Sequence, residues 1–183
     1  WNGAATYYRG ILRELAARGY AIHFYEPDAF DRQQHRDIDP PDWATVTVYP
    51  ATVEGLGRVM DEAADADVVV KASGVGVFDD ELIAGVMQRA APHALHIFWD
   101  VDAAATLDEM RVAPQHPVRQ ALPGLDLVLT YGGGDPVVNA YREMGARECI
   151  PVYNALDPAS HFPVPPDPRF ACDRGLEHPL DAA

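Results

Sequence analysis

The segment HIFWDVDAAATL, residues 96–107, carries the pattern on which the fold prediction rests. Its apolar first half ends in Asp100, a second carboxylate follows at Asp102, and the sequence then becomes rich in alanine. β-branched and aromatic residues favour strands, whereas alanines favour helices. The segment therefore predicts a buried strand over 94–100, followed by a helix that opens at Asp102 and continues to about Met110.

The same alternation of strands and helices extends outward in both directions. Apolar runs rich in valine, isoleucine and aromatic residues predict further strands, and apolar residues at helical spacing predict the helices between them. Strands are expected at 20–27, 44–50, 66–73, 125–131 and 148–153, and helices at 4–18, 52–64, 79–90 and 136–144, with a short helix around 32–36. The unbroken valines of ADVVVKAS predict a strand buried on both faces. This order of elements predicts an α/β fold with a Rossmann-like, doubly wound parallel sheet.

The domain organisation follows from the two ends of this alternation. We expect one Rossmann-like domain over residues 1–158, a proline-rich hinge over 159–170 and an unassigned tail over 171–183. The first helix has no strand before it, although such a helix normally follows a strand in an α/β fold. We therefore expect that the first strand, and a second domain beyond the hinge, lie outside this sequence.

The composition excludes several classes of function. The chain of 183 residues has 14 lysines and arginines against 28 aspartates and glutamates, a formal net charge of −14. That balance argues against binding nucleic acids or anionic membranes, both of which need a cationic surface. The two cysteines show no metal-binding spacing, and no apolar run approaches the roughly 20 residues of a membrane span. We expect reduced thiols, a cytoplasmic location, and neither a metal nor a cofactor.

Candidate binding residues lie in the loops that follow the predicted strands. In open α/β sheets, ligands bind beyond the carboxyl ends of the strands, so these loops are expected to share one rim. The glycines are equally explained as tight turns, and the lysine as a side chain that extends to solvent or holds an anionic group. The expected substrate-binding residues are Asn2, Gly3, Lys71, Ser73, Gly74, Tyr131, Gly132, Gly133, Gly134, Asp135 and Asn154.

The two acids of the opening segment are the candidate catalytic residues. Asp102 stands where a helix N-cap is expected, although a functional role is also open to it. Asp100 has no such structural explanation, and a carboxylate at the end of a buried strand is costly unless it is paired or solvated. We therefore expect Asp100 to face the cleft as a general base, with Asp102 as the second candidate.

Five segments together resemble a known family. In chain order they are WNGAATYYRGILRELAARGY, HFYEPD, FWDVDAAATL, DLVLTYGGGDPVV and PVYNALDPASHFPV. This ordered set, over roughly residues 1–165, resembles the N-terminal half of CgeB-like glycosyltransferases, bacterial proteins often labelled as similar to spore maturation proteins. The final segment looks like the passage between the two domains of GT-B glycosyltransferases, except that NALD replaces the usual phrase and the tail after it does not fit.

The resemblance implies two Rossmann-like domains that face a cleft. The C-terminal domain would bind the nucleotide-sugar donor, and the domain matched by this chain would bind the still unknown acceptor. By position, Asn2 and Gly3 look like the loop after the first strand, Asp100 and Asp102 like the acidic loop, and Gly132–Asp135 like a second cleft loop. GT-B enzymes typically use no bound metal, so DVD at 100–102 is interpreted as a chance likeness to the metal-binding DxD motif. The fragment alone would be inactive.

Two other classes of function stay open on the sequence. One is a non-catalytic Rossmann-like module that binds a small anion or a sugar. The other is a dinucleotide oxidoreductase, for which Glu26 could close the second strand, although WNGAAT lacks the GxGxxG pattern.

Overall fold

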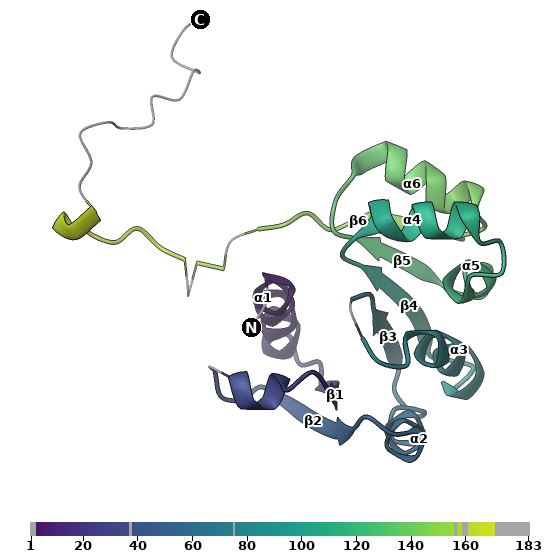
Figure 1. Ribbon diagram of the computed structural model, residues 1–183, viewed down its shortest axis with the longest axis horizontal. Helices are drawn as coiled ribbons and strands as arrows, with labels where there is room; N and C mark the ends of the chain where they lie inside the picture. The colour runs from purple at the N-terminus through teal and green to yellow at the C-terminus, as the bar shows by residue number, and fades with distance from the viewer. Residues whose placement is uncertain (1–2, 37, 75, 156, 159–160, 171–183) are drawn as a thin grey trace, which may run out of the picture.

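The computed structural model describes residues 3–36, 38–74, 76–155, 157–158 and 161–170. Its strands are β1 (Ile22–Asp28), β2 (Ala44–Pro50), β3 (Val68–Ala72), β4 (Leu95–Asp100), β5 (Leu127–Thr130) and β6 (Cys149–Pro151). Its α-helices are α1 (Gly3–Ala17), α2 (Val53–Glu62), α3 (Asp79–Arg89), α4 (Ala103–Val112), α5 (Pro117–Ala121) and α6 (Gly134–Glu143). Two 3-10 turns, η1 (Arg32–His35) and η2 (Pro168–Phe170), complete the set. The expected α/β alternation is confirmed (Figure 1).

Local sequence explains where several of these elements begin. The Thr52 hydroxyl accepts a hydrogen bond of 3.1 Å from the Gly55 amide, so Thr52 caps α2 as its position predicted. Helix α5 was not predicted from the sequence. This helix is only about one turn long, which is too short for apolar periodicity to reveal it. It starts at Pro117, and proline is well suited to the first position of a helix.

The strands form two parallel sheets rather than one. β1 pairs with β2, and β3, β4, β5 and β6 pair in that order. Parallel strands need crossover connections, and the helices between the strands supply them. The carboxyl ends of β3 to β6 therefore lie along one edge, as the candidate site requires.

The hydrophobic core lies on one face of the four-stranded sheet. Helices α3, α4, α5 and α6 cover this face, and β4, β5 and β6 contribute the strand side of the core (Figure 1). Its most buried members are Ile83, Phe98, Met110, Leu122, Leu125, Val128 and Tyr141. Because side chains alternate along a strand, Asp100 shares this face with Phe98.

The prediction that β3 is buried on both faces is wrong for one of them. Lys71 points to the helix-covered side and is buried, whereas Val68 is 41% exposed and Val70 44% exposed. A continuous valine run does not by itself reveal which helices will cover each face.

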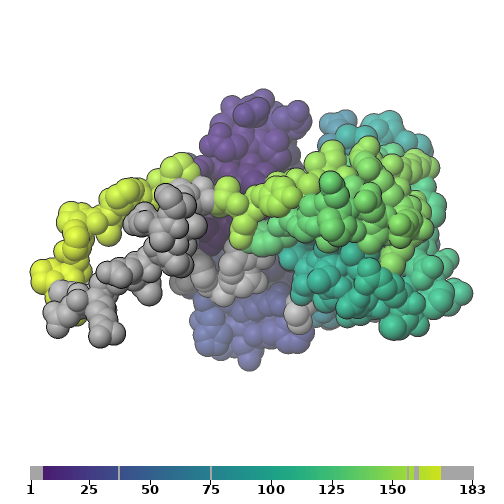
Figure 2. All heavy atoms as spheres, turned by 90° about the horizontal axis from the view of Figure 1, so that it is seen from above, coloured from purple at the N-terminus to yellow at the C-terminus, as the bar shows by residue number. Residues whose placement is uncertain are grey.

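The remainder of the chain needs only brief description. Residues 161–170 extend outward beyond the two sheets (Figure 2, yellow), and the expected tail over 171–183 and positions 159–160 of the expected hinge lie outside the described residues. Among the described residues, no helix is both long enough and apolar enough to cross a membrane.

Candidate functional site

Asp100 is the centre of a buried hydrogen-bond network. Its side chain is fully buried, and its Oδ1 accepts hydrogen bonds of 2.9 Å from the Ser73 hydroxyl and 2.9 Å from the Asp102 amide. Its Oδ2 accepts a hydrogen bond from the hydroxyl of Tyr141 on α6. The Ser73 hydroxyl in turn accepts the Val101 amide at 2.8 Å. The carboxylate thus ties β3, β4, the start of α4 and α6 together.

The expectation that Asp100 faces the cleft is wrong. A buried carboxylate is tolerated when hydrogen bonds replace its lost hydration, and the network supplies three of them. Burial, and then the charge of Asp100, raise the pKa of Tyr141, so its hydroxyl remains a donor across the physiological range. Asp100 therefore has the structural role that its sequence position did not reveal.

Asp102 has the opposite placement. It occupies the N-cap position of α4, and its backbone carbonyl accepts the Thr106 amide at 3.1 Å, but its side chain makes no capping hydrogen bond. The side chain is exposed. Its expected role as a side-chain cap is therefore wrong, and its carboxylate is left available on the surface. The two acids of DVD also diverge, so they do not present a shared pair of carboxylates to a cation.

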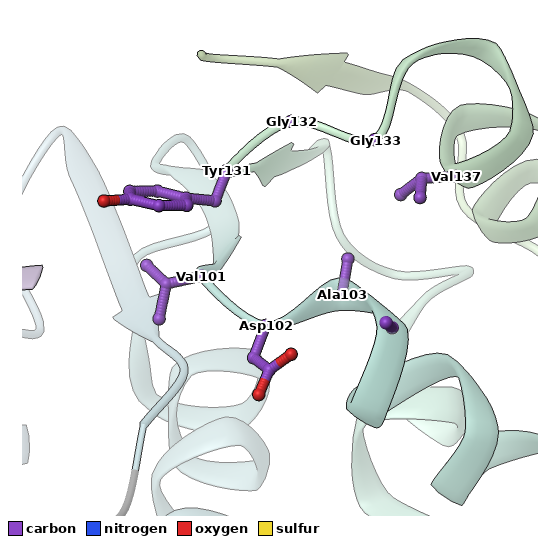
Figure 3. A pocket seen from close by; sticks show the side chains of 8 residues that line it. Val101, Asp102, Ala103, Tyr131, Gly132, Gly133 and Val137 are labelled. Carbon is purple, nitrogen blue, oxygen red and sulfur yellow. The ribbon is translucent and has the colours of Figure 1, made fainter. Parts of the chain in front are cut away.

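A surface pocket of about 240 Å³ lies beside Asp102, at the carboxyl ends of β4 and β5. It opens between the first turns of α4 and α6 (Figure 3). In Figure 3 the Asp102 carboxylate lies on the rim and points away from Gly132 and Gly133. Rotation about its side-chain bonds would be needed to turn it inward. The lining residues are Val101, Asp102, Ala103, Ala104, Tyr131, Gly132, Gly133 and Val137.

The glycine run forms one wall of the pocket in a conformation that favours glycine. Gly132, Gly133 and Gly134 all have positive φ, and a Cβ on Gly133 would lie 2.3 Å from the Cγ2 atom of Val137. Gly133 is the N-cap residue of α6, with Asp135 exposed in the first turn. The run is therefore required both as a tight turn and for close approach to the helix.

An aromatic group lies next to this wall and fixes the position of Tyr131. The ring of Tyr131 lies edge-on to the ring of Tyr7, with 4.6 Å between the ring centres. The ring centres of Tyr7 and Tyr8 lie 5.7 and 5.1 Å from that of Trp99. The Tyr7 hydroxyl donates a hydrogen bond of 2.9 Å to the Val152 carbonyl. Burial raises the pKa of both Tyr7 and Tyr8. Helix α1 is thereby attached to the carboxyl edge of the four-stranded sheet.

Lys71 does not extend to solvent, and the anionic group that it holds is a side chain of the protein itself. Its side chain is buried, its Nζ atom lies 2.5 Å from the Asp79 carboxylate and 5.8 Å from the centre of the Phe98 ring. Asp79 is in the first turn of α3 and also accepts the Gly76 amide at 3.2 Å. The ammonium group is already neutralised by this ion pair, so it neither extends to solvent nor stands ready for a ligand anion.

The other predicted residues are divided between the pocket and its surroundings. The structure brings Asp102, Tyr131, Gly132 and Gly133 together at the pocket, and Gly134 and Asp135 continue from it into α6. Ser73 belongs to the Asp100 network. The remaining predictions are placed as follows: Gly74 and Asn154 are exposed, Gly3 is the first residue of α1, and Asn2 lies outside the described residues.

Sequence reasoning missed Tyr141 and Val137. Both lie on α6, which the sequence predicted as a helix over 136–144. Its buried residues, Val138 and Tyr141, are three apart, which is the spacing of one helix face. That signal could have placed Tyr141 in the core, but no local signal connects it to Asp100. Val137 lies one turn into the helix. Its contact with the glycine run can be recognised only when the conformation of the turn is known.

Chemically, the pocket combines an exposed carboxylate with the amino ends of two helices. The first amides of a helix lack intrahelical acceptors, and the helix dipole places partial positive charge there.

Comparison of the chain with known protein families, curated proteins and solved structures finds no match in any of the three. The chain is thus an α/β domain with parallel sheets, and its family resemblance remains an interpretation of its sequence.

Proposed function

We propose that this chain is the acceptor-side domain of a GT-B-type glycosyltransferase, which transfers a sugar from a nucleotide-sugar donor to an acceptor. The observation that supports this most is the pocket at the carboxyl ends of β4 and β5, with the exposed Asp102 carboxylate on its rim. The order of the five resembling segments supports it independently. In this proposal the domain is one Rossmann-like half of the enzyme, and the donor binds to a second domain.

Asp102 is the proposed general base. The acceptor hydroxyl would attack the anomeric carbon of the donor, its proton would pass to the Asp102 carboxylate, and the bond from that carbon to the nucleoside diphosphate would break. The amino ends of α4 and α6 would favour the negative charge that develops on the departing diphosphate. Asp100 has no direct role in this step, because its carboxylate is buried. It positions Asp102 instead, through the hydrogen bond from the Asp102 amide.

A non-catalytic module that binds a small ligand is the second candidate. Two of the charged groups predicted for the site are already bonded within the protein, which favours this candidate. Asp100 is held by its hydrogen-bond network, and Lys71 is paired with Asp79. A pocket with one exposed carboxylate and two helix amino ends could bind a small polar ligand without transforming it.

The test uses the longest polypeptide that the natural gene encodes, incubated with UDP-, GDP-, ADP- and TDP-linked sugars. Release of nucleoside diphosphate, by transfer or by slow hydrolysis, is the measured quantity. Asp102→Asn is expected to lower kcat about a hundredfold or more, with an unchanged unfolding midpoint. Asp65→Asn is the matched control, because it removes the same charge from an exposed position between α2 and β3 and is expected to leave kcat unchanged.

The two candidates give different outcomes in this test. Folded protein that releases no diphosphate from any of the four donors would contradict the glycosyltransferase. If sugars or their phosphates then still shift the amide resonances of Ala103 and Gly133, the binding module is supported. Equal losses of kcat in the Asp102 and Asp65 variants would remove Asp102 as the base.

A further inference from the structure

Two polar atoms are buried without hydrogen bonds in the aromatic group that adjoins the pocket. They are the hydroxyl oxygen of Tyr8 on α1 and the indole nitrogen Nε1 of Trp99 on β4, and neither has a partner among the described residues. Trp99 as a whole is only 6% exposed. Such groups are rare in folded proteins, because a polar group that loses its hydration and gains no partner is destabilising. A ligand that supplies the missing partner would recover this cost.

The position of the two atoms connects them to the pocket. The rings of Tyr8 and Trp99 are nearly perpendicular, at 88°, and the ring of Tyr7 lies against both of them and against Tyr131. Tyr131 lines the pocket, and in Figure 3 its hydroxyl points away from the glycine run. The aromatic group therefore continues from the pocket wall toward α1.

Tyr7 does not satisfy the indole group of Trp99. The Tyr7 hydroxyl donates its own hydrogen to the Val152 carbonyl at 2.9 Å. The indole lowers the pKa of Tyr7, although burial raises that pKa by more, and the two side chains do not reach hydrogen-bonding geometry. The indole N–H thus lies near the Tyr7 oxygen with its hydrogen unused.

The charges nearby decide which kind of ligand group fits. Burial, then Tyr7 and the buried carboxylate of Asp100, raise the pKa of Tyr8, so its hydroxyl stays protonated. The same carboxylate would repel a ligand anion. An ammonium group only donates hydrogen bonds, so it would leave the indole N–H unpaired. An uncharged hydroxyl group can accept from the indole and exchange a hydrogen bond with Tyr8.

We propose that the Tyr8 hydroxyl and the Trp99 indole together bind a hydroxyl group of an uncharged sugar or polyol. Tyr8 is half-buried, so its ring can turn outward to admit the ligand, and the neighbouring pocket would hold the rest of it. An apolar site with a few convergent polar groups is typical of small-molecule binding. The further conclusion, that the acceptor is an uncharged sugar or polyol, rests on the proposed function, whereas the hydroxyl-binding site does not.

The experiment measures binding without any nucleotide-sugar donor. It follows the NMR signal of the Trp99 indole N–H, assigned by its loss in Trp99→Phe, in the longest polypeptide that the natural gene encodes. The neutral probes are the methyl glycosides of glucose, galactose and mannose, and myo-inositol; the charged probes are glucose 6-phosphate, glucuronate and glucosamine. We expect at least one neutral probe to shift this signal and to slow hydrogen exchange of the indole about tenfold, and the charged probes to do neither.

Tyr8→Phe is the discriminating variant, because it removes a hydroxyl without a partner among the described residues. We expect it to weaken binding of the neutral probe about tenfold and to leave the unfolding midpoint unchanged or higher. A purely structural role of the hydroxyl would lower the midpoint instead. Tyr20→Phe is the matched control, since it makes the same change in a side chain that is 59% exposed, and it should alter neither quantity.

The proposal is overturned if no neutral probe perturbs the Trp99 signal, which is the result expected if an internal water pairs the two atoms. It is also overturned if the charged probes bind as well as the neutral ones, or if Tyr8→Phe binds them as tightly as the natural chain does. Release of nucleoside diphosphate without a shift at Trp99 would contradict this site and leave the glycosyltransferase standing. A shift at Trp99 without release from any donor would support the site and contradict the glycosyltransferase.

Discussion

The hydroxyl of Tyr141 on α6 donates a hydrogen bond to the carboxylate of Asp100 at the end of β4, across 41 residues of sequence. This contact explains why Asp100 can be fully buried in an otherwise apolar core. The other oxygen of Asp100 accepts the Asp102 amide, so the same buried carboxylate is bonded both to α6 and to the start of α4. The pocket therefore depends on a buried pair that does not line it.

Removal of the Tyr141 hydroxyl is expected to destabilise the protein. Tyr141→Phe keeps the ring but leaves Oδ2 of Asp100 without its buried donor, at a cost of about 1–3 kcal/mol. Urea unfolding monitored by circular dichroism measures the loss. Tyr153→Phe is the control, since that side chain is 62% exposed, and it should change the free energy of unfolding by less than about 0.5 kcal/mol. Equal effects of the two variants would contradict the role assigned to the network.

The two acids of the loop are expected to respond differently to amidation. Asp100→Asn places an amide nitrogen among hydrogen-bond donors in a buried site, so it should lower the free energy of unfolding by about 2 kcal/mol. Asp102→Asn changes an exposed side chain without a capping bond and should stay within about 0.5 kcal/mol of the natural chain. Thermal and urea unfolding compare the two directly, and a larger loss for the Asp102 variant would reverse the assignment.

Adding a methyl group at Gly133, in the glycine run, is expected to destabilise the protein. Gly133→Ala must place a Cβ 2.3 Å from the Val137 side chain at a φ of 85°, which should cost about 1–3 kcal/mol of stability. Gly57→Ala is the matched control, because a Cβ at this position in α2 meets no atom within 4 Å. It should stabilise the protein by about 0.5–1 kcal/mol through helix propensity. The prediction fails if both alanine variants shift the unfolding midpoint in the same direction.

Cys149 is expected to make stability fall at alkaline pH. Burial raises the pKa of its thiol from 9.0 to about 11. The unfolded chain therefore loses this proton at lower pH than the folded chain, so the contribution to stability is full below pH 9 and decreases as the pH rises toward 11. Urea unfolding at pH 8 and pH 9.5 should show a drop that Cys149→Val reduces.

Reactivity of the same thiol gives a separate check. In a Cys172→Ser background, which leaves Cys149 as the one cysteine of the chain, Ellman's reagent at pH 8 should react slowly with folded protein and rapidly in urea. Rapid reaction in the folded state would show that the thiol is neither buried nor held in its protonated form.

The sequence predicted well what depends on local pattern. Apolar patterns, caps and helix stops predicted the strands and, among the described residues, every α-helix except α5, whereas the short η2 was not predicted. Thr52 could be recognised as the cap of α2 because a cap and its amide are only three residues apart. The carboxyl-edge loops were predicted from the order of strands and helices, and part of them does meet at the pocket. These features depend on neighbours in the sequence or on general rules of parallel sheets.

The tertiary structure decided the roles of the two acids. By sequence, Asp102 had a structural explanation as a cap, whereas Asp100 had none and was the first candidate for a catalytic base. In the structure Asp100 has the structural role, and Asp102 occupies the N-cap position without a capping side-chain hydrogen bond. The carboxylate of Asp100 is buried because the alternation of side chains along β4 places it on the same face as Phe98. There it accepts a hydrogen bond from Tyr141, which is 41 residues further along the sequence. Burial and hydrogen-bond partners are properties of such distant contacts, and two carboxylates separated by one residue carry no local signal that distinguishes them.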